Sequence, residues 1–97
     1  MAEARQLAKV FRALSVDTRV RIVQLLKEHP YCVNALAAQL DITPAAVSQH
    51  LRVLRDANLV APDKQGYFVH YRINEATLAA WRELADGLLG TRRKEGV

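Results

Sequence analysis

The sequence lacks features that several classes of protein require. It has a single cysteine, so no intrachain disulfide can form, and a zinc finger built from several cysteines is excluded. No apolar run approaches the roughly eighteen residues that a membrane-spanning helix needs, so no membrane partner is expected. The first seven residues mix charged and apolar side chains, which argues against a secretory signal. A reducing compartment, the cytoplasm, is the expected location.

Glycine and proline are also scarce. The 97 residues contain four glycines and three prolines, and no linker rich in either precedes residue 90. This length suits one small domain, and a composition with 51% hydrophobic and 25% charged residues is that of a globular protein. We therefore predict one folded domain over residues 1–90, followed by a basic, disordered tail over residues 91–97.

Positive charge exceeds negative charge, and arginine supplies most of it. The net charge is +4, and ten of the 14 basic residues are arginines. Arginine forms forked hydrogen bonds with phosphate and guanine, so the composition is compatible with a nucleic-acid partner. An ordinary solvated surface is the alternative, and charge alone does not decide between them.

Hydrophobic periodicity predicts five helices, because apolar residues recur every three or four positions in five segments. These segments are residues 2–14, 17–28, 33–40, 44–57 and 75–89. The expected side-chain caps of their N-termini are Ser15 or Asp17, Asn34, Thr43 and Asn74.

The third and fourth helices are joined by a very short turn. Thr43 suits the N-cap of the fourth helix, and Pro44 suits its first position, where the missing N–H costs nothing. Val47, Leu51 and Leu54 form its inward stripe, which leaves small and polar residues on the outer face.

A two-stranded hairpin is expected next. Asn58 tolerates a left-handed conformation and can end the fourth helix. Residues 59–61 are a short apolar run, residues 64–66 read as a turn, and residues 67–73 are β-branched and aromatic with alternating character. A lone hairpin is marginally stable, so this one must pack on the helices.

Four helices, a hairpin and a last helix (α-α-α-α-β-β-α) predict a mainly α fold with a small β-hairpin, the winged helix-turn-helix. Ala45 on the outer face would allow close approach to DNA, Gln49 can pair with adenine, and Arg52 can pair with guanine or a phosphate. The alternative is that this face is merely solvated. The predicted DNA-binding residues are Thr43, Ala45, Ser48, Gln49, His50, Arg52, Lys64, Gln65 and Tyr67.

Three stretches carry a family resemblance: residues 13–23 (ALSVDTRVRIV), 47–60 (VSQHLRVLRDANLV) and 65–73 (QGYFVHYRI). They resemble the opening motif, the recognition helix and the wing of the ArsR/SmtB family of bacterial repressors, with Asn58 where glycine is usual. The resemblance implies a homodimer, paired through its first and last helices, on an inverted-repeat operator in double-stranded DNA. It also implies that an effector releases the DNA, and it favours a phosphate contact for His50.

The residues themselves also favour a homodimer. The first and last helices carry more apolar surface than a small domain can easily cover, and two-fold symmetry commonly matches palindromic DNA sites. The alternative is that the apolar faces of the first and last helices pack within one chain. The predicted interface residues are Leu7, Val10, Phe11, Leu14, Leu78, Trp81, Leu84 and Leu88.

The effector is unknown, and the candidate residues are few. Cys32 matches the first cysteine of a metal-binding "CVC" motif of the family, but Asn34 replaces the second. Another family site uses histidines of the last helix, and residues 74–90 contain none. Stable soft-metal sites need three or four ligands, so neither a metal nor another cofactor is predicted. Cys32 and His29 remain effector candidates, with a thiol switch and a simply packed cysteine as the alternatives.

Two other functions compete with DNA binding as interpretations of the sequence. An enzyme needs a nucleophile, a base and an electrophilic anchor in one pocket, and Cys32 with His29 is the one pair that could begin such a site, so no enzyme is predicted. A winged helix that only binds proteins would expose an apolar recognition face, whereas this sequence places Ser48, Gln49 and Arg52 there.

Overall fold

The structure is a computed structural model that describes residues 2–90. All five predicted helices and the hairpin are present, with helix ends within two residues of their expected positions. Residue 1 and the basic tail predicted for residues 91–97 lie outside the described residues. The elements are α1 (Ala2–Ala13), α2 (Asp17–Leu26), β1 (Tyr31–Cys32), α3 (Val33–Leu40), α4 (Pro44–Asp56), β2 (Val60–Gln65), β3 (Phe68–Ile73) and α5 (Glu75–Leu89).

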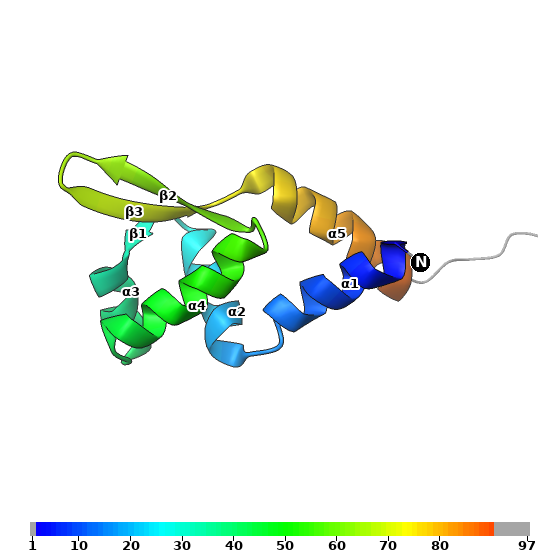
Figure 1. Cartoon of the computed structure of the whole chain (residues 1–97), viewed down its shortest axis with the longest axis horizontal. Helices are drawn as coiled ribbons and strands as arrows, with labels where there is room; N and C mark the ends of the chain where they lie inside the picture. Colours follow the sequence, from blue (N-terminus) through cyan, green and yellow to red (C-terminus); the bar gives the residue numbers. More distant parts are fainter. Residues whose placement is uncertain (1, 91–97) are drawn as a thin grey trace, which may run out of the picture.

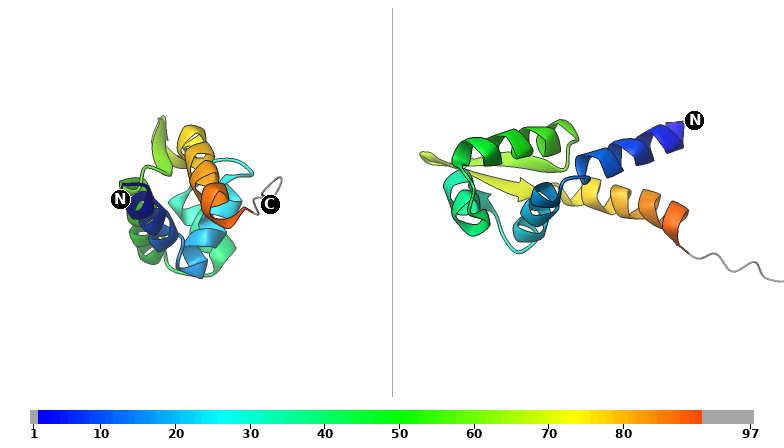
Figure 2. Two further views of the ribbon diagram at one scale, coloured as in Figure 1. Left: turned by 90° about the vertical axis from the view of Figure 1, so that its right-hand side faces the viewer. Right: turned by 90° about the horizontal axis from the view of Figure 1, so that it is seen from below.

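The molecule is elongated, with extents of 58 × 24 × 24 Å. Helices α2, α3 and α4 pack with the sheet at one end, while α1 and α5 lie side by side at the other end (Figures 1 and 2). The tip of the β2–β3 hairpin and the turn between α3 and α4 both lie at the end far from α1 and α5 (Figure 1). The fold therefore separates two surfaces by the length of the molecule.

The hydrophobic core lies between α2, α3, α4 and the sheet. Ile22 of α2, Leu36 of α3, and Leu51 and Leu54 of α4 are at most 1% exposed, and Leu59, which precedes β2, is fully buried. Burying side chains of this size is the main source of stability in a small domain. This core fixes α4 against α3 and supports the root of the hairpin.

The sheet has a third strand that the sequence did not reveal. Strand β1 pairs antiparallel with β3, so the strand order is β1-β3-β2. Tyr31 lies opposite Tyr71, and Cys32 lies opposite His70. A strand of two residues is too short to show an alternating pattern, which is why periodicity could not predict it.

The predicted side-chain cap of α2 is wrong. The N-cap is Val16, and neither Ser15 nor Asp17 caps the helix through its side chain. The Ser15 hydroxyl instead donates to the carbonyl of Arg12 at 2.8 Å. The Arg19 guanidinium donates to the last two carbonyls of α1 at 2.7 and 3.0 Å. These donors satisfy the last backbone carbonyls of α1. The corner between α1 and α2 is therefore fixed by hydrogen bonds to α1 and not by a side-chain cap of α2.

Of the other three predicted caps, one is wrong and two are confirmed. Asn34 lies inside α3, whose N-cap is Cys32 without a side-chain hydrogen bond. Thr43 and Asn74 are confirmed: each accepts a hydrogen bond from the backbone N–H three residues later, at 3.1 and 3.3 Å. The two confirmed caps begin the helices α4 and α5.

Candidate nucleic-acid interface

A tight turn positions the start of α4. Asp41 adopts the left-handed conformation (φ 57°) that ends α3, and its neighbour Ile42 donates its backbone N–H to the carbonyl of Ala37 at 3.2 Å. Thr43 then caps α4, with Pro44 at its first position as predicted. The turn between the two helices is therefore only three residues long, as in a helix-turn-helix.

Helix α4 has one buried face and one free face. Val47, Leu51 and Leu54 are buried, and His50 lies partly buried at the edge of that stripe. Within the part of the chain that the structure describes, no hydrogen bond engages the outer side chains, whose donors and acceptors are therefore free. The predicted outer-face residues that are exposed are Ala45, Ser48, Gln49 and Arg52.

The C-terminus of α4 is closed by a Schellman motif. Asn58 has a φ of 64°, the Leu59 N–H donates to the Leu54 carbonyl at 3.0 Å, and the Asn58 N–H donates to the Arg55 carbonyl at 2.8 Å. The Asn58 side-chain amide also donates to the Thr77 hydroxyl at 3.3 Å. Asn58 thus ends α4 as predicted and ties that end to the start of α5.

We expect Asn58→Gly to leave the free energy of unfolding within about 0.5 kcal/mol of the wild type, because glycine adopts a positive φ without strain. Asn58→Val should lower it by about 1–2 kcal/mol, because a β-branched side chain is strained in the left-handed region. Urea unfolding followed by circular dichroism measures both.

Asn34→Val is the matched control, since Asn34 is exposed and lies within the right-handed helix α3. Equal losses for the valine variants at positions 34 and 58 would show that the left-handed turn does not decide the effect.

The hairpin carries the remaining predicted residues. Gly66, with a φ of 65°, occupies the first of the two turn positions between β2 and β3, the arrangement of a type II′ hairpin turn. Lys64, Gln65 and Tyr67 are all exposed around this tip. Phe68, which sequence reasoning did not select, is also exposed (67%). Its place in the alternation of β3, on the face away from Tyr71 and Ile73, is the signal that could have found it.

Residues 17–61 match the family model described as "Bacterial regulatory protein, arsR family". The transcriptional repressor SmtB homolog of Synechocystis sp. is 36% identical over 87 residues, which is 89% of this chain and 66% of that repressor. The crystal structure of a possible transcriptional regulator for arsenical resistance is 42% identical, with 82% of this chain and 83% of that chain covered and a TM-score of 0.75. The chain belongs to the ArsR family of bacterial regulatory proteins.

A third relative bears on assembly. The solution structure of a homodimeric winged helix-turn-helix DNA-binding domain from Mycobacterium bovis, a possible ArsR-family regulator, is 26% identical; 97% of this chain and 91% of that chain are covered, with a TM-score of 0.72. Family membership and these neighbours confirm the predicted winged helix-turn-helix fold and a transcriptional regulator in place of an enzyme. The chain spans slightly less than two thirds of the SmtB homolog.

In this ArsR-family chain, α1 and α5 form the surface at the end of the molecule far from the turn between α3 and α4 (Figure 1). Helix α5 has no buried residue along its 15 positions. Phe11 and Leu88 are 38% and 56% exposed, whereas Val10 is buried within the single chain. A groove of ≈ 440 Å³ runs between α1, the end of α4 and α5. The other predicted interface residues, all partly buried, are Leu7, Leu14, Leu78, Trp81 and Leu84.

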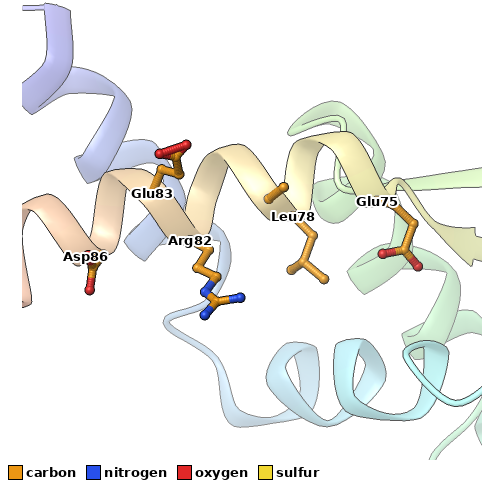
Figure 3. A pocket seen from close by; sticks show the side chains of 6 residues that line it. Glu75, Leu78, Arg82, Glu83 and Asp86 are labelled. Atoms are coloured by element: carbon orange, nitrogen blue, oxygen red, sulfur yellow. The ribbon is translucent and has the colours of Figure 1, made fainter.

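A second hollow, of ≈ 500 Å³, runs along another face of α5. Figure 3 shows Leu78 and Arg82 extending from this helix toward α2, with Glu75 and Asp86 further along the same side and Glu83 on the other side of the ribbon. Within residues 2–90, no group of three or more histidine, cysteine, aspartate or glutamate residues is placed to hold a metal ion. No helix in this part of the chain is both long and apolar enough to cross a membrane.

The two effector candidates do not form a pair in the structure. The His29 ring packs against the Tyr31 ring, with centroids 4.2 Å apart, and its Nδ1 donates to the carbonyl of Pro30 at 2.7 Å. Cys32, partly buried, follows Tyr31 in β1 and so points to the opposite face of the sheet. Its cross-strand neighbour is His70, whose Nδ1 is buried without a hydrogen-bond partner among the described residues.

Proposed function

We propose that this chain is a homodimeric transcriptional repressor that binds an inverted-repeat operator in double-stranded DNA in the cytoplasm and leaves it when an effector binds. The observation that carries the proposal is the free outer face of α4. Among residues 2–90 its small and polar side chains make no hydrogen bond, and its buried face fixes the helix on the core. A helix of this kind fits the major groove of B-DNA.

The outer face of α4 supplies the base contacts in this proposal. Ala45, near the N-terminus of α4, allows the backbone to approach the base edges, and Ser48 can donate or accept a hydrogen bond. The Gln49 amide can pair with adenine through two hydrogen bonds, and the Arg52 guanidinium can pair with guanine or a phosphate. These four side chains are exposed along one face of the helix.

Phosphate contacts come from the edges of this surface. The Thr43 hydroxyl oxygen accepts the capping hydrogen bond, which leaves its proton free to donate to a phosphate. His50, partly buried beside the core stripe, is placed to do the same from α4. Lys64, Gln65 and Tyr67 would contact the adjacent groove or its phosphates from the hairpin.

Dimerisation through α1 and α5 completes the proposal. These helices leave apolar side chains exposed at the end of the molecule remote from the α4 turn (Figure 1). A two-fold axis there would carry the two α4 helices outward, to two half-sites of an inverted repeat. The homodimeric ArsR-family neighbour supports this assembly.

Salt dependence tests the phosphate contacts. We expect operator affinity to fall linearly on a log–log plot against salt, with a slope of about −0.9 for each phosphate neutralised. Lys64→Ala should weaken binding to all duplexes alike and reduce the slope by about one phosphate per half-site, because Lys64 contacts no base. Fluorescence anisotropy on labelled duplexes at several salt concentrations measures both.

Lys27→Ala is the control, since Lys27 is also exposed but follows α2, away from the hairpin. Identical slopes for wild type and Lys64→Ala would show that Lys64 contacts no phosphate.

The effector is proposed to act at Cys32, with His29 nearby along the chain. Cys32→Ser should bind operator DNA as tightly as wild type but stay bound when thiol-reactive compounds or soft metal ions release the wild-type protein. Mobility shifts with and without each compound measure release, and because the chain has one cysteine, any thiol adduct seen by mass spectrometry is on Cys32. His29→Gln shows whether the neighbouring imidazole contributes. If the same compounds release Cys32→Ser from operator DNA, this cysteine is not the sensor.

A further inference from the structure

The tip of the hairpin exposes three consecutive apolar side chains. Tyr67, Phe68 and Val69 are 101%, 67% and 40% exposed. Val69 lies on the opposite face of β3 from Phe68, so the apolar cluster at the tip is the adjacent pair Tyr67 and Phe68. Exposed aromatic side chains are common singly, but such a cluster at the end of a projecting element marks a contact surface. No predicted role of the hairpin in phosphate binding needs these side chains to be apolar.

The fold explains why this cluster stays uncovered. The type II′ turn at Gly66 holds Tyr67 at the extremity of the hairpin. Phe68 pairs with Gln65 and shares its face of β3 with His70 and Arg72, away from the core. Val69 pairs with Lys64 and lies on the inward face of β3. It is 40% exposed because the helices that bury Ile73 on the same face do not reach the tip.

The surroundings of the cluster indicate its occupant. The tip lies at the same end of the molecule as the turn that begins α4, so it continues the proposed DNA-binding surface (Figure 1). On the face of Phe68, β2 places Asp63 opposite His70, and Arg72 follows along β3; Lys64 lies on the other face, opposite Val69. Exposed aromatic side chains at the end of a hairpin that continues the α4 surface and carries Lys64 on its other face suit a duplex, whose phosphates border a groove floor of stacked bases.

We propose that Phe68, with Tyr67 beside it, is an apolar wedge that enters the minor groove next to each half-site, loosens one base step and bends the operator. This inference rests on the proposed function, because it takes the duplex bound by α4 as given. Apolar wedges of this kind partially unstack a step and kink DNA toward the major groove. Phe68 offers no hydrogen bond, so it selects DNA by deformability instead of by base identity.

The wedge adds a specificity that α4 cannot supply. Pyrimidine–purine steps such as TA unstack easily, whereas A-tracts are stiff. Operators should therefore carry a flexible step at one fixed position outside each α4 half-site, even though no hydrogen bond reads that step. Discrimination between flexible and stiff base steps would come from Phe68, and discrimination against wrong bases would come from Gln49. Separate substitutions can therefore remove each kind of discrimination.

The experiment uses the full chain and duplexes that the wild-type protein selects from a random pool. Each base step flanking the half-sites is changed to TA or to AA, and affinity is measured by anisotropy. Bending is measured by energy transfer between dyes at the two duplex ends. We expect wild type to bend the duplex and to prefer TA over AA at one flanking step by about fivefold or more.

Phe68→Thr keeps a residue suited to a strand but removes the wedge, so it should leave the duplex straighter and reduce the step preference to less than about twofold. Phe68→Leu keeps an apolar wedge and should retain both properties. Tyr67→Ser, at a fully exposed turn position, gives a second loss of apolar surface that does not touch a strand. Lys64→Ala should weaken binding while leaving the bend and the step preference intact.

The outcomes separate this inference from the proposed function. Selection of no specific duplex by the wild type would overturn both. Specific binding to an unbent duplex, or a bend and step preference unchanged in both Phe68→Thr and Tyr67→Ser, would overturn the wedge and leave the repressor proposal standing.

Discussion

Replacing Phe11 and Leu88 together by glutamate is expected to reduce operator affinity by about a hundredfold or more, because it uncouples two half-site contacts that a dimer makes at once. Both side chains are substantially exposed in the single chain, at 38% and 56%, so the change costs the fold little. It places like charges from two copies against each other across a two-fold axis. Sedimentation velocity gives the oligomeric state, and anisotropy on selected duplexes gives the affinity.

Val20→Glu is the matched control for this experiment. Val20 is 36% exposed and lies on α2, outside the α1 and α5 surface. We expect this variant to remain dimeric and to bind as wild type does. A Phe11 and Leu88 double variant that stays dimeric would place the interface elsewhere. A monomeric variant with undiminished operator affinity would contradict two-fold recognition.

Local chemistry made the start of α4 predictable. Thr43 caps the helix, Pro44 fits its first position, and Val47, Leu51 and Leu54 mark the buried face, all within twelve residues of sequence. The left-handed Asn58 was likewise predictable, because few residue types adopt that conformation. Each of these features depends on residues near it in the chain, so the sequence alone was sufficient to place α4 and its exposed face.

Features that depend on distant parts of the chain escaped prediction. Strand β1 exists because β3, some forty positions later, supplies its hydrogen bonds, so no local pattern encodes it. The same pairing sets Cys32 opposite His70 and away from His29, its nearest histidine in the sequence. The caps of α2 failed for a related reason, because Ser15 had a carbonyl of α1 within reach. Where a side chain can form a hydrogen bond with either of two neighbouring groups, the tertiary geometry decides which bond forms.

Gln49→Ala is expected to reduce affinity for the selected operator by about ten- to a hundredfold, while affinity for random duplexes changes less than about twofold. The reason is that a bidentate contact with a base is lost, whereas contacts with phosphates are kept. Gln24→Ala is the control, since Gln24 is exposed on α2 and makes the same change in composition. Equal losses on operator and random duplexes would show that Gln49 contacts the backbone.

Arg52→Lys separates the two roles that remain open for Arg52 and so completes the test of α4. Lysine keeps the positive charge but lacks the planar fork that pairs with guanine through two hydrogen bonds. If Arg52 reads a guanine, the variant should lose about tenfold or more on the operator and tolerate other bases at that position. If it binds a phosphate, the loss should be small and equal on all duplexes. Because Arg52 lies one turn beyond Ser48 on the same exposed face, the first result would place the readout along two turns of α4, and the second would confine it to the N-terminal turns around Gln49.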